Sequence, residues 1–188
     1  MRRLIPAIAA SSLMLALVAC VVAGQPAVAP TAANTPTAIS TQAVEWAPRF
    51  INEDEGYTLR FTSDYNLVLY QRSVCFTTAE GVEMVCHVAN AFIDVSDAEG
   101  QTLAQAADAV AANANPEIEV QRSEIEVGGE PAVLLDDIYA YDVLRKVVVL
   151  HGERLYVLTF VPWVPELDDF SRINALYETI IETMEFLG

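Results

Sequence analysis

The sequence has few of the residues on which hydrolytic and metal chemistry depend. Its 188 residues include only two histidines, His87 and His151, and three cysteines. It contains no Gly-x-Ser-x-Gly nucleophile elbow, no His-Glu-x-x-His zinc helix and no glycine-rich phosphate loop. The sequence therefore predicts a protein without catalytic activity and without a cofactor.

Basic residues are also scarce. Ten Lys and Arg face 26 Asp and Glu, a formal net charge of −16. Nucleic acids and anionic lipid surfaces attract basic proteins, so binding to either through charge is not expected. The expected partners are cations, basic protein surfaces or neutral ligands. The alternative is that the acidity only maintains solubility.

Charge is absent altogether from residues 4 to 44. Arg2 and Arg3 precede an almost wholly apolar stretch, residues 4 to 24, and this layout is typical of a secretory signal. The stretch is long enough to reach across a hydrocarbon core of ~30 Å. However, a proline and two serines interrupt its first half, and no Lys or Arg follows it to act as a stop.

The end of this stretch carries a resemblance. Leu17-Val18-Ala19-Cys20 resembles the lipobox of bacterial lipoproteins, with Leu three positions before the cysteine and a small residue directly before it. In that family the peptidase cuts before the cysteine, whose thiol carries a diacylglycerol and whose new amino group is commonly acylated. Two or more acyl chains make a stable anchor. We expect lipidation at Cys20, with an uncleaved anchor and ordinary secretion as the alternatives.

Removal of the signal, residues 1–19, leaves 26 acidic and eight basic residues, a net charge of −18. Residues 20–44 follow, uncharged and rich in Pro, Ala and Thr. Prolines favour extended polyproline conformation at about 3.1 Å per residue, so this tether could reach on the order of 70 Å. Residues 45–188 are expected to form the folded domain.

The periodicity of the domain predicts strands and two helices. Thr102 with Gln105 three residues later is a capping box, opening a helix that Asn115-Pro116 ends. A second helix with an acidic start is expected near the C-terminus. Strands are expected at 56–61, 66–71, on both sides of Glu80-Gly81, at 117–129, at 130–138 and on both sides of a turn at 151–153. This order predicts an α+β fold, mainly an antiparallel sheet flanked by helices.

Two cysteines flank the expected hairpin tip at Glu80-Gly81. If those two residues form the loop, Cys75 lies opposite Cys86 at a separation that a disulfide tolerates. Two cysteines placed in this way in an exported domain are expected to be bonded. The alternatives are two reduced, buried thiols or a register shifted by a bulge. His87 would point to the opposite face from Cys86, which argues against a metal site.

Several segments together resemble the PsbP/Mog1 superfamily. They are Gly56–Phe61, the helix at Thr102-Leu103, "IEVGGEPAVLL", "VVVLHGERLYVLTF" and the closing helix that ends at Glu182–Leu187. Their most specific parts are Gly128-Gly129 before a strand of small residues and a hairpin turning at a Gly before Tyr-x-Leu-x-Phe. The resemblance implies an α/β/α sandwich over roughly residues 50 to 188. It implies a binding or assembly module, often exported or lipid-anchored in bacteria, with no shared catalytic residues.

Aromatic residues provide candidates for partner contact. Trp163 lies between two prolines in a strand-to-helix loop, where it could anchor a partner or pack on the last helix. Packing is the interpretation we favour. Tyr139 and Tyr141 are further candidates for contact with a partner.

The same region carries weak candidates for a metal site. Asp136, Asp137 and Asp142 could offer oxygen ligands to a divalent cation. Their spacing does not match a calcium loop, so a solvated acidic loop is the favoured interpretation. His151 is expected to be exposed in a turn.

Together these patterns predict a bacterial lipoprotein, exported and anchored to a membrane through Cys20. Its acidic domain is expected to be a non-catalytic binding or accessory module in an envelope assembly, with an envelope protein as partner. A lipoprotein that binds a small molecule or a divalent cation is the alternative. A hydrolytic enzyme is third.

Overall fold

A computed structural model describes residues 47–78 and 88–188. The predicted signal peptide, Cys20, the tether, the hairpin tip at Glu80-Gly81, Cys86 and His87 lie outside the described residues. Predictions that concern them stay predictions.

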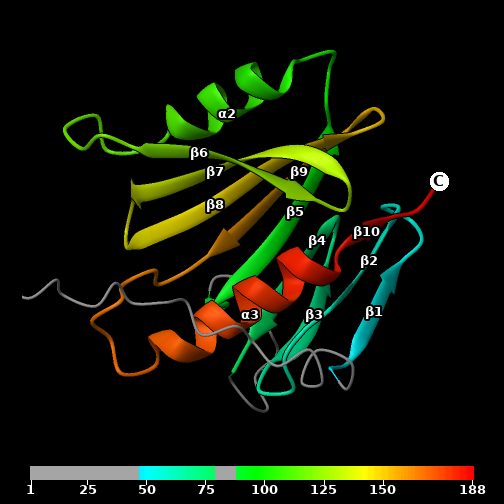
Figure 1. Cartoon of the computed structure of the whole chain (residues 1–188), viewed down its shortest axis with the longest axis horizontal. Coiled ribbons are helices and arrows are strands. Elements are labelled where there is room, and N and C mark those ends of the chain that lie inside the picture. Colours follow the sequence, from blue (N-terminus) through cyan, green and yellow to red (C-terminus); the bar gives the residue numbers. More distant parts are fainter. Residues whose placement is uncertain (1–46, 79–87) are drawn as a thin grey trace, which may run out of the picture. The chain divides into compact units, whose positions relative to one another are not determined.

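Seven antiparallel strands form the main sheet, in the order β3-β4-β5-β9-β8-β7-β6 (Figure 1). Along the chain they are β3 (Asn66–Tyr70), β4 (Ser73–Thr77), β5 (Ala91–Asp97), β6 (Gln121–Val127), β7 (Glu130–Tyr139), β8 (Val143–His151) and β9 (Arg154–Phe160). A smaller antiparallel sheet contains β1 (Arg49–Asn52), β2 (Tyr57–Arg60) and β10 (Glu185–Phe186), with β2 in the middle. With the helices α2 (Leu103–Ala111) and α3 (Phe170–Thr183), this confirms the predicted α+β class with mainly antiparallel sheet.

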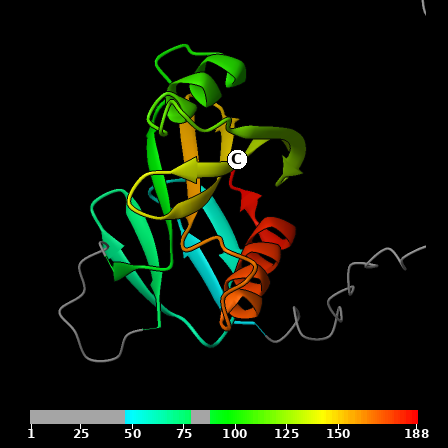
Figure 2. The ribbon, with the colours of Figure 1, turned by 90° about the vertical axis from the view of Figure 1, so that its left-hand side faces the viewer.

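The helices α2 and α3 pack on opposite faces of the main sheet (Figure 2). Successive side chains of a strand point to opposite faces, and β8 shows the consequence. Val148 packs with Ala106 of α2, whereas Val147 and Val149 belong to the core that contains Leu176 of α3. The core that contains Leu176 is the larger of the two, and it also includes Tyr57 and Leu59 of β2. The helix α3 therefore packs against both sheets.

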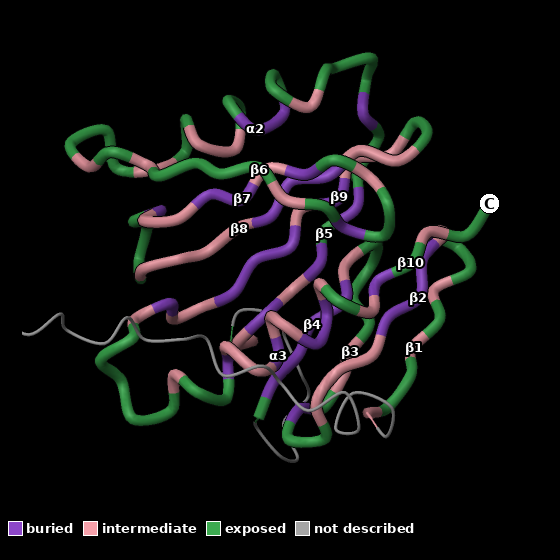
Figure 3. Tube along the Cα trace, in the orientation of Figure 1, coloured by how far each residue is buried: buried purple, intermediate pink, exposed green. Residues whose placement is uncertain are grey.

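The larger core is built from aromatic and aliphatic side chains of both sheets and α3. The buried residues lie in the central strands, whereas β6 and much of β1 are exposed (Figure 3). Tyr57 and Tyr156 meet edge to face with ring centroids 5.9 Å apart, a geometry that aromatic pairs prefer. The apolar stripe of α3 buries Ile173, Leu176 and Ile180 against the sheets.

The start of α2 confirms a local prediction. The Thr102 hydroxyl accepts a hydrogen bond from the Gln105 amide, and the Thr102 amide donates to the Gln105 side chain at 2.9 Å. The helix ends at Ala111, earlier than predicted. One reason is that the Asn115 amide donates to the Tyr139 carbonyl at 3.0 Å, which draws the chain away from the helix axis.

The predicted register between the strands on either side of Glu80-Gly81 is wrong. On β5 the residue opposite Cys75 is Phe92, and on β3 it is Val68. The register assumed from the sequence placed Cys75 opposite Cys86, whereas the strand that pairs with β4 on this side begins only at Ala91. Cys75 is disulfide-bonded. Its predicted partner, Cys86, lies outside the described residues, so that pairing stays a prediction.

Candidate functional site

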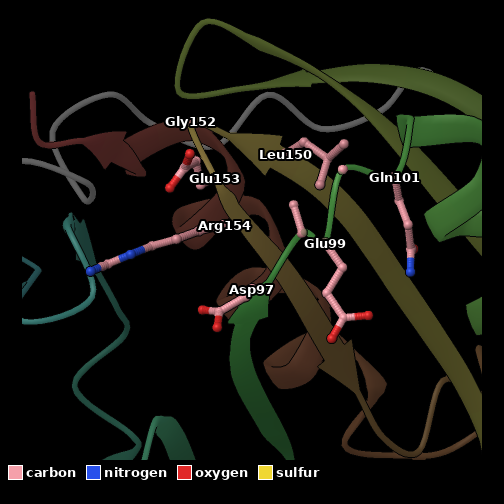
Figure 4. A pocket seen from close by; sticks show the side chains of 9 residues that line it. Asp97, Glu99, Gln101, Leu150, Gly152, Glu153 and Arg154 are labelled. Carbon is pink, nitrogen blue, oxygen red and sulfur yellow. The ribbon is translucent and has the colours of Figure 1, made fainter.

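A hollow of about 660 Å³ lies at one end of the main sheet, between the β8–β9 turn and the loop from β5 to α2. Two short loop segments and three strand residues line it (Figure 4): Asp97, Ala98, Glu99, Gly100, Gln101, Leu150, Gly152, Glu153 and Arg154.

A backbone hydrogen bond and two tight turns position the two segments that line the hollow. The Ala98 amide donates to the Glu153 carbonyl at 2.8 Å, which ties the β5–α2 loop to the β8–β9 turn. The loop reverses through Glu99 and Gly100, both with positive φ, at 50° and 72°. Gly152 has φ 59° in the β8–β9 turn, a conformation that glycine adopts without steric cost. These backbone contacts therefore fix the positions from which the Glu99 and Glu153 side chains extend.

Three carboxylates and one guanidinium give the hollow its charge. Asp97 accepts a hydrogen bond from Arg72 at 3.1 Å, and Arg154 lies 3.4 Å from Glu55. Figure 4 shows Arg154 extending away from Glu99 and Gln101. Among the described residues, Glu99 and Glu153 make no ion pair and no side-chain hydrogen bond. These two carboxylates are thus available to an ammonium, a guanidinium or a cation.

A network of ion pairs and hydrogen bonds around Glu55 holds Arg154 in place. Arg72 forms a two-point contact with the Glu55 carboxylate, at 2.8 and 3.1 Å. The Glu55 side chain is only 12 % exposed, and its backbone carbonyl accepts a 2.7 Å hydrogen bond from the Tyr156 hydroxyl. Burial raises the pKa of Tyr156 above its ordinary value, so this hydroxyl remains a donor at neutral pH. In this network Arg72 pairs with both Glu55 and Asp97, and Arg154 pairs with Glu55.

His151 lies on the other side of the same turn, beside a second hollow of about 310 Å³. Its Nδ1 is 2.8 Å from Oε1 of Glu130, and its ring stacks on Phe186 with centroids 4.6 Å apart. It therefore lies at the end of β8 with partners on two sides rather than exposed in a turn as predicted. The described residues that line this second hollow with His151 include Glu53, Glu153, Arg154 and Tyr156.

Of the aromatic candidates, Trp163 is in the core. It is 8 % exposed and meets Phe170 and Tyr177 of α3 edge to face. This position agrees with packing on the last helix, which is the interpretation favoured from the sequence. Tyr139 and Tyr141 lie at the β7–β8 turn and are exposed, Tyr141 completely. They stay predicted partner contacts, and they lie outside the hollow described above.

The three aspartates considered as cation ligands do not come together as a site. Asp136 is held by Arg145 at 2.6 and 2.7 Å, and Asp142 accepts from the Val143 amide at 2.8 Å. Asp137 has φ 60° where the β7–β8 register shifts. In residues 47–78 and 88–188, no group of three or more His, Cys, Asp or Glu side chains is placed to hold a metal ion.

Sequence reasoning missed the hollow, because Asp97, Glu99 and Glu153 belong to segments far apart in the chain. The only signal was an acidic residue beside a turn glycine in each segment, at Glu99-Gly100 and Gly152-Glu153. Neither helix in the described part of the chain is long and apolar enough to cross a membrane.

No protein-family model matches the chain, and no curated protein sequence matches it.

Proposed function

We propose that this protein is a bacterial lipoprotein, anchored through Cys20 and exported, whose domain is a non-catalytic binding module in an envelope assembly. The hollow beside Glu153 receives a basic side chain, Lys or Arg, of the partner. One observation carries this proposal: Glu99 and Glu153 have no ion-pair partner within residues 47–78 and 88–188, whereas Asp97 and Arg154 have such partners.

Charge supports the same assignment. The mature chain would carry a net charge of −18, so a basic partner surface would be steered toward it. Within the hollow, Arg154 is paired to Glu55 and offers little opposition to an incoming cation. A charged side chain that contacts both Glu99 and Glu153 would form charge-assisted hydrogen bonds, which are stronger than neutral ones.

The layers of the fold favour the finer classification as a PsbP/Mog1-like α/β/α sandwich. The main sheet has α2 on one face and α3 on the other, as that resemblance implies. Because the superfamily shares no catalytic residues, the resemblance agrees with a binding role rather than a reaction.

A second candidate function is binding of a small molecule. The volume of the hollow, about 660 Å³, lies within the roughly 300–1,000 Å³ of typical ligand pockets. Its lining is mostly polar and acidic, which favours an amine-bearing ligand. A saturable thermal shift with one such ligand would distinguish this function from recognition of a protein.

The test is affinity purification of the lipidated protein from its native membranes after mild crosslinking, with mass spectrometry of what is recovered. The double variant Glu99→Gln/Glu153→Gln removes two charges from the hollow without changing side-chain size. Glu124→Gln/Glu126→Gln removes the same charge from the exposed surface of β6 and serves as the matched control.

We expect a stoichiometric basic partner with the parent chain and the control, and its loss with the double variant. Equal recovery with both variants would place the contact elsewhere. Recovery of the protein alone would overturn the assembly role. The mass of the N-terminal peptide from the same sample tests lipidation at Cys20.

A further inference from the structure

The strand β3 forms one edge of the main sheet (Figure 1). Its five residues, Asn-Leu-Val-Leu-Tyr, carry no charge. Leu69 is 63 % exposed and Tyr70 is 49 % exposed. Among the described strands only β4 pairs with β3, and an uncharged edge with exposed apolar residues is a template for pairing with another strand. Charged side chains on an edge strand are one of the features that protect it from such pairing.

The opposite edge, β6, has that protection. Its exposed residues include Arg122, Glu124 and Glu126. Pairing of two β6 strands around a two-fold axis at Glu124 would bring two carboxylates together, which is unfavourable. The two edges of the sheet therefore differ in their capacity to accept another strand.

The direction of the backbone groups on β3 follows from its neighbours. The Phe76 carbonyl accepts from the Asn90 amide, so the backbone groups of Phe76 point toward β5. In an antiparallel ladder these directions alternate, so the groups of Cys75 point toward β3 and meet Val68. The amides and carbonyls of Leu67 and Leu69 consequently point away from β4, where no described strand pairs with them.

We propose that two copies of this chain associate through β3, with the two strands antiparallel around a two-fold axis at Val68. In this register Leu67 of each copy lies opposite Leu69 of the other. All outward amides and carbonyls of these residues are then satisfied by four hydrogen bonds. Val68 faces Val68 of the second copy as a non-hydrogen-bonded pair, which completes the alternation.

The side chains agree with this register. Leu67 packs against the larger core, on the α3 side of the sheet, and Leu69 points to the same side because it lies two residues further along. Pairing places the exposed Leu69 beside Leu67 of the second copy. The contact therefore extends the existing core across the junction instead of forming a new one.

Charge favours a second copy as the occupant. A chain with a net charge of −16 repels itself over most of its surface, so a contact between copies requires an uncharged strip such as β3. The anchor proposed above would confine copies to one membrane and raise their effective concentration. The pairing itself does not depend on any ligand in the hollow.

The backbone geometry provides a selective variant. Leu69→Pro removes an amide that points outward, so it disrupts no hydrogen bond of the single copy, and proline is tolerated at such edge positions. Leu69→Lys keeps the amide but places an unpaired charge at the junction. Glu124→Pro and Glu124→Lys are the matched controls on the other edge of the sheet. Val127 pairs with Glu130 at the β6–β7 turn. Because backbone directions alternate along a strand, the Glu124 amide points away from β7.

The experiment is sedimentation velocity of the full lipidated chain in detergent over a concentration series, with far-UV circular dichroism to verify folding. We expect a concentration-dependent dimer for the parent chain and both Glu124 variants. Leu69→Lys should raise the dimer dissociation constant at least about tenfold, and Leu69→Pro should give a monomer. A monomeric parent chain at all concentrations would overturn the proposal. A dimer that Leu69→Lys leaves unchanged would overturn it too.

A photo-crosslinking residue at Tyr70 in native membranes tests which chain occupies the edge. A crosslinked product of twice the chain's mass that contains only this protein supports a second copy. A product with a different protein overturns that choice of occupant.

Discussion

The guanidinium of Arg145 lies 3.9 Å from the centre of the Trp163 ring, stacked on it. The same guanidinium is 4.7 Å from the centre of the Tyr177 ring and holds Asp136 with two hydrogen bonds. Its side chain is 17 % exposed. One arginine thus joins β8, the loop after β9, α3 and β7. This explains how a charged residue can lie at the boundary of an aromatic core.

Arg145→Lys should destabilise the domain by about 2 kcal/mol, because an ammonium can neither stack on two rings nor bind a carboxylate at two points. The measurement is the free energy of unfolding in urea. Arg122→Lys is the control, since Arg122 is 45 % exposed and pairs only with the exposed Asp108, and it should cost less than about 0.5 kcal/mol. Equal losses for the two variants would show that the stacking contributes nothing.

Gly128→Ala should displace the C-terminal strand. A Cβ at Gly128 would lie 2.9 Å from the Phe186 ring and 3.1 Å from the Met184 carbonyl, and φ is 58°. Steric overlap adds to backbone strain, so we expect a loss of about 2–3 kcal/mol. At Gly129, φ is 83° and nothing lies within 4 Å of the added Cβ. Gly129→Ala should therefore show the strain alone, about 1 kcal/mol. Thermal unfolding of both variants separates the two effects.

Lys146→Met should stabilise the domain at neutral pH. Burial lowers the pKa of Lys146, and its neighbour across the ladder, Thr159, has a buried hydroxyl without a hydrogen bond among the described residues. Because the folded pKa lies below the unfolded one, the cost of the partly buried charge is complete below the folded pKa. It is relieved as pH rises through the folded pKa toward the ordinary value.

We expect a gain of about 1 kcal/mol for Lys146→Met at pH 7, decreasing toward pH 10.5, the ordinary value for lysine. Urea unfolding at both pH values measures it. A gain that does not change with pH would mean that packing, and not charge, is responsible.

Alkaline pH should destabilise the domain through its buried tyrosines. Burial raises the pKa of Tyr65 to about 12 and raises the pKa of Tyr57 and Tyr177 as well. A raised folded pKa means that the unfolded chain loses its protons first. The stabilising contribution is therefore complete below about pH 10 and is lost as pH rises through about 12.

Thermal unfolding between pH 8 and 12, followed together with tyrosinate absorbance, measures this loss. Tyr57→Phe removes one of these groups, whose hydroxyl is buried without a partner among the described residues. It should make the alkaline loss less steep and leave stability at pH 7 unchanged or slightly higher. A pH profile identical to that of the parent chain would exclude Tyr57 as a contributor.

Features with a local cause were predicted correctly from the sequence. The capping box of Thr102 and Gln105 depends on residues three positions apart. The turn between β8 and β9 depends on Gly152, and the buried stripe of α3 on a repeat of 3.6 residues. In each case the interacting groups lie within one element or one turn, so their order in the chain already defines their geometry.

Features that join distant segments were missed or wrong. The register of Cys75 failed because its strand pairs with residues beyond a long connection, and no nearby residue marks where pairing resumes. The short strand β10 exists only because β2 offers it an edge. The hollow between Glu99 and Glu153 exists only because the Ala98 amide meets the Glu153 carbonyl. These contacts depend on how the strands are ordered in the sheet, and that order is selected by burial of the whole core rather than by any short stretch of chain.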